Sequence, residues 1–408
     1  MILEAKKKHI VIVCANFHPM KHIAAFRMNA FVKYFDKEYF DITVIASNES
    51  APEGTSNFEG ATVRYLGGRK WIKIRKQYQG MKRWMHHLYS LNNKLIRFFS
   101  KSDYPGWVNN IGIQLESIHQ DKKINFLLTT FFPIDAHIAG LNFKVNHPKT
   151  IWVADMRDEM SMNVLIDKKE KAYFVKMEQK IGQLVDIVTS VSQPIIDGFK
   201  QNMIDSRIKF LEIRNGFDHD IISTVNFNSV FTFTYAGTFY GKRKPDTFFA
   251  ALIELKKEKK LPNELKIQFL GTHENFSIPN EFKNQCIFLE SVANEKAIEI
   301  LIQSDCNIMI HPPSEAKGIF TGKLFDYLSV RKPILALLDK EDVAADLIEE
   351  CRAGVNCDFY DIPEIKSAII QLILCWETKQ TLNYDEDRIK LLHRKDQVKK
   401  LENQLLEF

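Results

Sequence analysis

The chain has 408 residues, more than one ordinary hydrophobic core organises, so two domains of roughly 150 to 200 residues are expected. Hydrophobic residues make up 45% and charged residues 26%, and no apolar run reaches the roughly 18 residues that span a bilayer. A membrane-spanning protein is therefore excluded, and a cytoplasmic protein is expected. The six cysteines are scattered without a C-x-x-C pair, so buried free thiols are favoured.

Charge is unevenly divided along the chain. The net charge is +5, but residues 1–218 hold 32 Lys and Arg against 22 Asp and Glu, a balance of +10, which leaves −5 for residues 219–408. The stretch 69–101 alone has ten Lys and Arg, no acidic residue, and interleaved tryptophan and phenylalanine. Such a stretch suits an anionic membrane surface or a nucleic acid, or else an amphipathic helix packed on its own domain.

Apolar strand-like segments alternate with helical patterns from the N-terminus onward. In the first half these segments are 9–15, 40–47, 124–130, 150–156 and 186–192, with a helical pattern over 24–34. In the second half they are 231–237, 266–271, 286–291, 306–312 and 333–338. This alternation is typical of a parallel sheet with helices on both faces, so two doubly wound α/β domains are expected.

The sequence IRNGFDHD separates the two series, and Asn215-Gly216 within it is a turn signal. The predicted organisation is a first domain at 1–218, a hinge at 219–229, a second domain at 230–382 and a C-terminal helix at 383–408. Ligands of such sheets bind outside the carboxyl ends of the strands, so a site in a cleft between two facing domains is expected.

A compact charged cluster follows the strand-like segment 150–156. It consists of Asp155, Arg157 and Asp158, and a carboxylate beside a guanidinium keeps its charge through pH 7. A structural ion pair explains the cluster nearly as well as a catalytic role does. We predict the catalytic role because strand ends are where loop residues carry out chemistry.

The stretch GIFTGKLFDYLSVRKPILAL, Gly318 to Leu337, places a glycine-flanked turn, a lysine and a carboxylate at the start of one helix. Free N–H groups and the helix dipole favour a bound anion there, and Lys323 adds a full charge. Asp326 lies on the same helix face, where it can accept hydrogen bonds from ribose hydroxyls. The predicted nucleotide-binding residues here are Phe320, Thr321, Gly322, Lys323 and Asp326.

This stretch resembles the donor-site signature of family 4 glycosyltransferases, in the branch that builds bacterial surface polysaccharides, where the pattern is "ftgKlfEYLa.gkPil". TIWVADMRDEM is similar to "wvaDfRDpW" of the same branch, and FHPMKHIAAFRMNAF to its "fPP..g.aaaR" loop. The resemblance implies a GT-B fold, in which two Rossmann-like domains face each other across a cleft and the last helix crosses back to the first domain.

Further site residues are implied by this resemblance. A glycine-containing loop grips the donor diphosphate, which points to Gly237 and Thr238, with Arg243 in preference to Lys242 or Lys244 as the cation. Arg27 either reaches the diphosphate or pins its own loop. In TTFFPIDAHIAG, His137 faces the cleft or, in our preferred interpretation, packs a helix.

One position departs from the family pattern. The family has two glutamates separated by seven residues; Asp326 occupies the second position and Gly318 the first. Either Glu315 supplies the missing carboxylate from the loop, or the donor sugar is held differently.

The implied activity is that of a retaining glycosyltransferase, moving a sugar from a nucleotide-sugar, with UDP-sugar preferred, to a glycan or lipid-linked acceptor in bacterial surface polysaccharide synthesis. The leaving diphosphate would be stabilised electrostatically, without a further cofactor. The alternatives are a GT-B sugar-nucleotide epimerase and a noncatalytic nucleotide-sugar-binding scaffold.

Metal and macromolecular partners follow from the same reasoning. Asp218-His219-Asp220 has D-x-D spacing, but it falls in a turn, where Asx residues favour local hydrogen bonds, so no metal site is predicted. With a lipid-linked acceptor, segment 69–101 favours peripheral contact with the inner face of the plasma membrane over nucleic acid.

Overall fold

The computed structural model describes residues 7–21, 23–67, 106–221 and 227–408. The chain divides into two compact units: the first comprises Met1–Arg214 together with Val398–Phe408, and the second Asn215–Gln397. The basic stretch 69–101 lies outside the described residues.

Unit 1 contains an eight-stranded sheet with the order β3-β4-β2-β1-β5-β6-β7-β8. Its strands are β1 (Lys8–Cys14), β2 (Phe40–Ser47), β3 (Gly54–Phe58), β4 (Ala61–Leu66), β5 (Phe126–Thr130), β6 (Ile151–Asp155), β7 (Ile187–Ser190) and β8 (Lys209–Glu212). All neighbouring pairs are parallel except β3 and β4. The two central strands, β1 and β5, are almost wholly buried, as expected for apolar strands covered on both faces.

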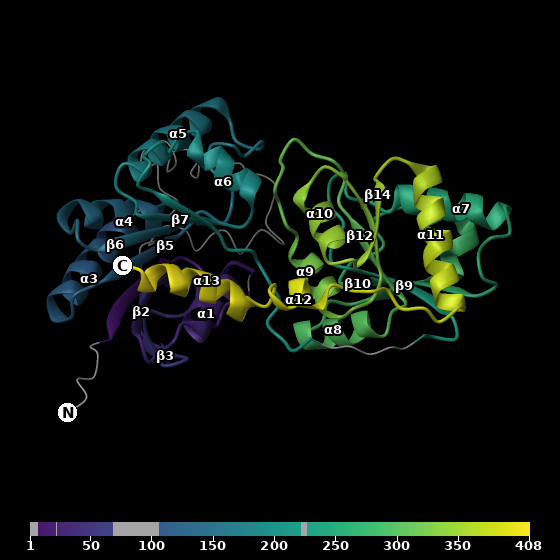
Figure 1. Ribbon diagram of the computed structural model, residues 1–408, viewed down its shortest axis with the longest axis horizontal. Coiled ribbons are helices and arrows are strands. Elements are labelled where there is room, and N and C mark those ends of the chain that lie inside the picture. Colours follow the sequence, from purple (N-terminus) through teal and green to yellow (C-terminus); the bar gives the residue numbers. More distant parts are fainter. Residues whose placement is uncertain (1–6, 22, 68–105, 222–226) are drawn as a thin grey trace, which may run out of the picture. The chain divides into compact units, whose positions relative to one another are not determined.

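Helices cover both faces of this sheet (Figure 1). One face carries α3 (Trp107–Asp121), α4 (Asp135–Asn146), α5 (Lys168–Gly182) and α6 (Gln193–Lys200), and the other carries α1 (Ile23–Tyr34) and part of α13 (Arg394–Leu406). The α13 side chains Val398, Leu401 and Leu405 are buried in the same core cluster as Ile10 and Ile12 of β1. The C-terminal end of the chain therefore belongs to the core of unit 1.

Unit 2 contains a six-stranded, wholly parallel sheet with the order β11-β10-β9-β12-β13-β14. Its strands are β9 (Phe231–Ala236), β10 (Leu265–Leu270), β11 (Cys286–Leu289), β12 (Cys306–Ile310), β13 (Ile334–Leu338) and β14 (Gly354–Asp358). One face is covered by α7 (Asp246–Lys257), α11 (Ile362–Glu377) and the 3-10 helix η2 (Asn280–Gln285). The other face is covered by α8 (Asn294–Ile302), α9 (Gly322–Ser329), α10 (Val343–Glu350) and α12 (Glu386–Lys390).

These two sheets confirm the predicted α/β class and the two doubly wound, Rossmann-like arrangements. The strand order in unit 2 jumps from β9 to β12, so the loops after these two strands leave the carboxyl edge on either side of a switch in strand order. Among the described residues, no helix is both long and apolar enough to cross a membrane.

Candidate functional site

The candidate site lies in unit 2, where β9, β12 and α9 meet. Strands β9 and β12 pair in parallel, so the loops that follow them leave the same edge of the sheet. Gly237 follows β9 with φ +112°, and a Cβ at this position would lie 2.4 Å from Cε of Lys323. Only glycine lets the lysine side chain lie this close to the loop backbone.

Lys323 stands in the first turn of α9. Its Nζ donates a hydrogen bond to Tyr235 Oη over 2.8 Å and lies 4.1 Å from the centre of that ring. Burial, followed by repulsion from Arg243, lowers the pKa of Lys323 to about 7. Next along the same helix, Tyr327 Oη accepts from the backbone N–H of Ala236 over 2.9 Å, which ties α9 to the end of β9.

Arg243 reaches the same place from the loop between β9 and α7. Its Nη2 donates to Nδ1 of His311 over 2.6 Å, and its guanidinium lies 4.9 Å from the centre of the Tyr240 ring. The residue is 9% exposed, and its Nε is buried without a partner. Burial and then Arg243 lower the pKa of His311 to about 4, so this imidazole is neutral at pH 7.

Arg243 and Lys323 share one electrostatic property. In the part of the chain that the structure describes, neither side chain has a carboxylate within ion-pair distance. Two neighbouring cations held out of water without a counter-charge are costly, and proteins normally pair them. Such an arrangement suits an anion, and Lys323 lies in the first turn of α9, where the helix dipole adds to the attraction.

The other predicted residues on α9 surround this pair. Thr321 caps α9 without a side-chain cap bond, and its Oγ1 is buried without a partner among the described residues. Phe320 is buried and packs on Phe325 at 5.6 Å between ring centres. Burial raises the pKa of Asp326 to about 6, against the opposing effect of Arg394. Gly322 opens the helix, and Thr238 is exposed, with its hydroxyl donating to Gly271 O over 3.3 Å.

The loop before α9 contains Gly318, the residue at the first of the two glutamate positions of the resemblance. Gly318 has φ +87°, a backbone conformation that favours glycine, and its N–H donates to Oδ1 of the buried Asp342 over 2.8 Å. Lys317 forms an ion pair with Asp339 from the adjoining loop. Glu315 is exposed at the same loop and stays a candidate for the missing carboxylate.

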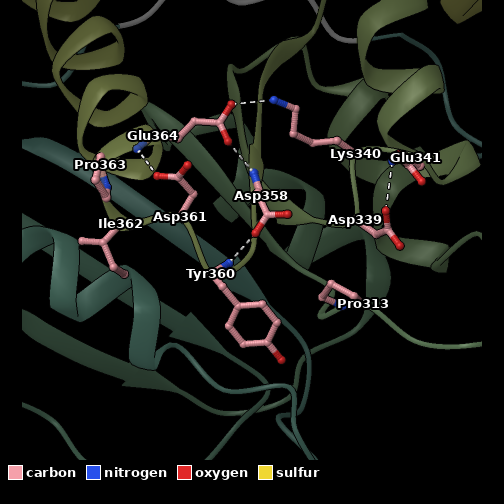
Figure 2. A pocket seen from close by; sticks show the side chains of 10 residues that line it. All are labelled: Pro313, Asp339, Lys340, Glu341, Asp358, Tyr360, Asp361, Ile362, Pro363 and Glu364. Atoms are coloured by element: carbon pink, nitrogen blue, oxygen red, sulfur yellow. Dashed lines mark hydrogen bonds and ion pairs between the residues drawn. The ribbon is translucent and has the colours of Figure 1, made fainter.

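A wide hollow of about 1020 Å³ opens beside this loop, at the carboxyl ends of β13 and β14 (Figure 2). Its carboxylates serve local structure: Asp358 accepts from the N–H of Tyr360, Asp361 from the N–H of Glu364, and Glu364 from Lys340 and the N–H of Asp358. Figure 2 shows these hydrogen bonds and the ion pair as dashed lines between the residues that line the hollow. None of the predicted site residues lines it.

In unit 1, Arg27 and Asp155 form a closed network. The Arg27 guanidinium donates to both Asp155 oxygens and to the carbonyl of Ile213, with the shortest ion-pair distance at 2.7 Å. The hydroxyls of Thr130 and Thr189 also donate hydrogen bonds to the Asp155 carboxylate. Burial acts to raise the pKa of Asp155, but Arg27 and the two hydroxyls hold it below its ordinary value.

The rest of the predicted acid–base cluster is more open. Arg157 Nε donates to Phe131 O over 2.7 Å and forms an ion pair of 3.0 Å with Asp158, which is exposed. The loop after β6 is anchored by Glu178, a buried carboxylate that accepts hydrogen bonds from the N–H and the hydroxyl of Ser161. Arg157 and Asp158 are thus presented at the end of β6, whereas Asp155 has no exposed surface.

Two further motifs have local partners. Asp218 faces Arg394 at 3.9 Å, and His219 Nε2 is bonded to Ser329 Oγ over 2.8 Å, so adjacent residues of the D-x-D motif are drawn to different groups. His137 is fully buried in α4, with Nδ1 2.7 Å from Thr129 Oγ1 and its ring stacked on Phe131. Its burial fits the helix-packing interpretation.

Sequence reasoning missed His311. The available signal was a polar residue placed directly after the buried strand segment CNIMI, at the carboxyl edge where ligands bind.

Comparison with known proteins establishes the fold. No family model matches the sequence. No curated protein matches it either. Solved structures match over nearly the whole chain: a sucrose-phosphate synthase from Thermosynechococcus elongatus (TM-score 0.64, 10% identity, 98% of this chain and 100% of that chain), HepE from Anabaena in complex with UDP-glucose (0.58, 14%, 98% and 98%), and the lipopolysaccharide outer core galactosyltransferase WaaB (0.61, 10%, 98% and 99%). At these identities the likeness shows the fold, and it confirms the predicted GT-B class.

Proposed function

We propose that this protein is a glycosyltransferase that uses a nucleotide-sugar donor, with a UDP-sugar as the first candidate. The observation that carries the proposal is the pair Arg243 and Lys323, neither of which has a carboxylate within ion-pair distance among the described residues, with Lys323 in the first turn of α9. A diphosphate supplies the counter-charge. The fold supports the proposal, since the similar solved structures include a synthase, a galactosyltransferase and a UDP-glucose complex.

In this proposal the second unit binds the donor. Gly237 and the start of α9 at Gly322 give the diphosphate close backbone approach, and Lys323 and Arg243 stabilise negative charge as the leaving group departs. Asp326 accepts from the ribose hydroxyls. Thr238, Phe320 and Thr321 shape the surrounding loops, and Glu315 approaches the donor sugar.

The first unit supplies the acceptor side. Arg157 and Asp158 contact the acceptor, because both are displayed at the end of β6. Asp155 acts behind them as a positioning residue that holds β5, β6 and β7 together through Thr130 and Thr189. Of the two roles open to Arg27, its contacts favour pinning its own loop.

The finer assignment rests on the sequence. The resemblance implies membership of family 4, retention of anomeric configuration, and extension of a bacterial surface glycan on a lipid carrier, without a metal or other cofactor. The strand series and the turn signal give the domain boundaries at 218, 229 and 382, and the basic, aromatic segment 69–101 is proposed to contact the inner face of the plasma membrane.

The test is incubation of purified protein with a panel of UDP-sugars, alone and with lipid-linked acceptors, followed by product analysis. Acceptor-dependent release of UDP with a new glycosidic bond supports the proposal. Sugar epimerised without any acceptor indicates an epimerase, and binding without turnover indicates a scaffold. Absence of nucleotide-sugar binding across a panel that also includes GDP-, ADP- and TDP-sugars would reject the donor site altogether.

A further inference from the structure

His311 occupies a fixed position beside the cations of the candidate site. It directly follows β12, and its backbone N–H donates to Leu337 O of β13 over 2.8 Å, which extends the pairing of these strands by one residue. The backbone is thus set by the sheet. From this position the imidazole Nδ1 lies 2.6 Å from Nη2 of Arg243.

The chemistry of this contact assigns the proton on the ring. An arginine guanidinium has only donors, so Nδ1 must be the acceptor and the ring proton must lie on Nε2. The charged groups that act on this ring are, from the strongest to the weakest, Arg243, which disfavours the imidazolium, Asp342, which favours it, Lys323, which disfavours it, and Asp339, which favours it. His311 is therefore a neutral acceptor toward Arg243.

A neutral acceptor has a consequence that a carboxylate would not have. It fixes the direction of the guanidinium without neutralising its charge, so the whole positive charge stays available to a ligand. The guanidinium also rests on the Tyr240 ring, whose face gives little directional control, and it is hydrogen-bonded to the Tyr235 hydroxyl, which accepts from Lys323 as well. Nε2 of His311 makes no hydrogen bond with the described protein groups, which leaves a second donor beside the guanidinium.

We propose that His311 is a positioning residue for Arg243, holding it as an uncompensated cation for the donor diphosphate, with its own Nε2–H as a second, uncharged donor to that group. This inference rests on the proposed function, and it names a residue that sets the affinity of the site for the donor diphosphate. It predicts that the side chain at 311 acts on diphosphate recognition and not on the nucleoside.

The experiment measures UDP and uridine binding by calorimetry for wild type and for His311→Asn, His311→Ala and His311→Asp. Asn is the matched variant, since its amide oxygen can take the place of Nδ1, and Asp has the same size but carries the charge that neutralises Arg243. We expect UDP affinity within about threefold to tenfold of wild type for Asn, more than about tenfold weaker for Ala, and about a hundredfold weaker for Asp. Uridine affinity should change less than about twofold in all three.

Coupling to Arg243 separates positioning from a general packing effect. In an Arg243→Met background, His311→Ala should weaken UDP binding by a few-fold at most, because only the contribution of the Nε2–H donor to the affinity remains to be lost. Thermal unfolding of each variant checks folding, and the Asn and Asp pair suffices if Ala is unstable. UDP affinity that is equal for Asn and Asp, or unchanged in all variants, overturns the inference while leaving the donor site intact. Wild type that binds neither UDP nor another nucleoside diphosphate overturns the donor site, and the inference with it.

Discussion

Two arginines in this molecule, Arg27 in unit 1 and Arg243 in unit 2, are almost equally buried, with exposures of 6% and 9%. Arg27 is surrounded by acceptors, including both oxygens of Asp155 and two backbone carbonyls. Among the described residues, the polar partners of Arg243 are neutral, namely His311 and the Tyr235 hydroxyl, and its buried Nε has no partner. What distinguishes the two arginines is therefore whether acceptors surround the charge, and not how deeply the charge is buried; on this difference we propose that Arg243 binds a ligand and that Arg27 does not.

The comparison predicts its largest effect in unit 1. Asp155→Ala leaves the Arg27 charge uncompensated and two hydroxyls without their acceptor, so the free energy of unfolding should fall by about 3–5 kcal/mol. Urea denaturation followed by circular dichroism measures it. The matched change in unit 2, Arg243→Met, removes a charge that has no carboxylate partner among the described residues and should lower the free energy of unfolding by less than about 1 kcal/mol.

A control keeps this result specific to the pair. In Arg27→Met/Asp155→Leu both charges leave together, so the loss should be clearly smaller than the sum of the two single losses. Equal losses of stability for Asp155→Ala and Arg243→Met would break the comparison between the two units.

The next largest effect concerns ligand binding at Lys323. Lys323→Met retains the aliphatic chain over Gly237 but removes the charge, so UDP binding should weaken by about 1.5–3 kcal/mol. The ligand-free protein should be at least as stable as wild type, because a partly buried unpaired ammonium is lost. Lys317→Met is the control, since that lysine lies in the loop that precedes α9 but is exposed and paired with Asp339, and it should leave UDP affinity unchanged. A variant at 323 that binds UDP normally would contradict the donor-site assignment.

Proton linkage sharpens the same comparison. The pKa of Lys323, lowered from 10.5 to about 7 in the free protein, should rise when a diphosphate binds, so binding takes up a proton above pH 7. UDP affinity should then fall by up to about tenfold per pH unit between about pH 7.5 and 9, a range in which the terminal phosphate stays ionised.

The stability of the free protein depends on pH in the opposite direction to UDP affinity. Between about pH 7 and 10.5 the unfolded chain binds more protons at Lys323 than the folded one, so this lysine makes stability rise with pH across that window. Calorimetry in buffers of different ionisation enthalpy measures the proton uptake, and Lys323→Met should abolish both trends. Wild-type affinity that stays constant across this range would show that Lys323 does not face the diphosphate.

The sequence was sufficient for the fold because strand and helix periodicity are local properties. The parallel strands at 9–15, 124–130 and 231–237 follow from their apolar runs, and the helix at Gly322 from its turn and amphipathic pattern. Partnership across the fold is not local. The bond between Asp155 and Arg27 joins residues 128 positions apart, and that between Arg243 and His311 joins residues 68 apart, so no spacing in the sequence revealed them. Similarly, the left-handed φ of Gly318 becomes visible only in three dimensions.

The smallest expected effect is that of metal removal. Asp218 faces Arg394 and His219 is bonded to Ser329, so these two residues of the D-x-D motif have protein partners, and we predict that the motif holds no metal. We expect UDP affinity and sugar transfer to stay within about twofold of the untreated protein when EDTA is present, and Asp218→Asn/Asp220→Asn to behave in the same way. The double variant tests one further point. Arg394 acts to lower the pKa of Asp326, so releasing Arg394 from Asp218 should favour the ionised form of Asp326 and leave ribose recognition undiminished. Loss of transfer in EDTA that Mn²⁺ or Mg²⁺ restores, together with loss in the double variant, would place a metal at this turn and extend the donor site beyond the two unpaired cations.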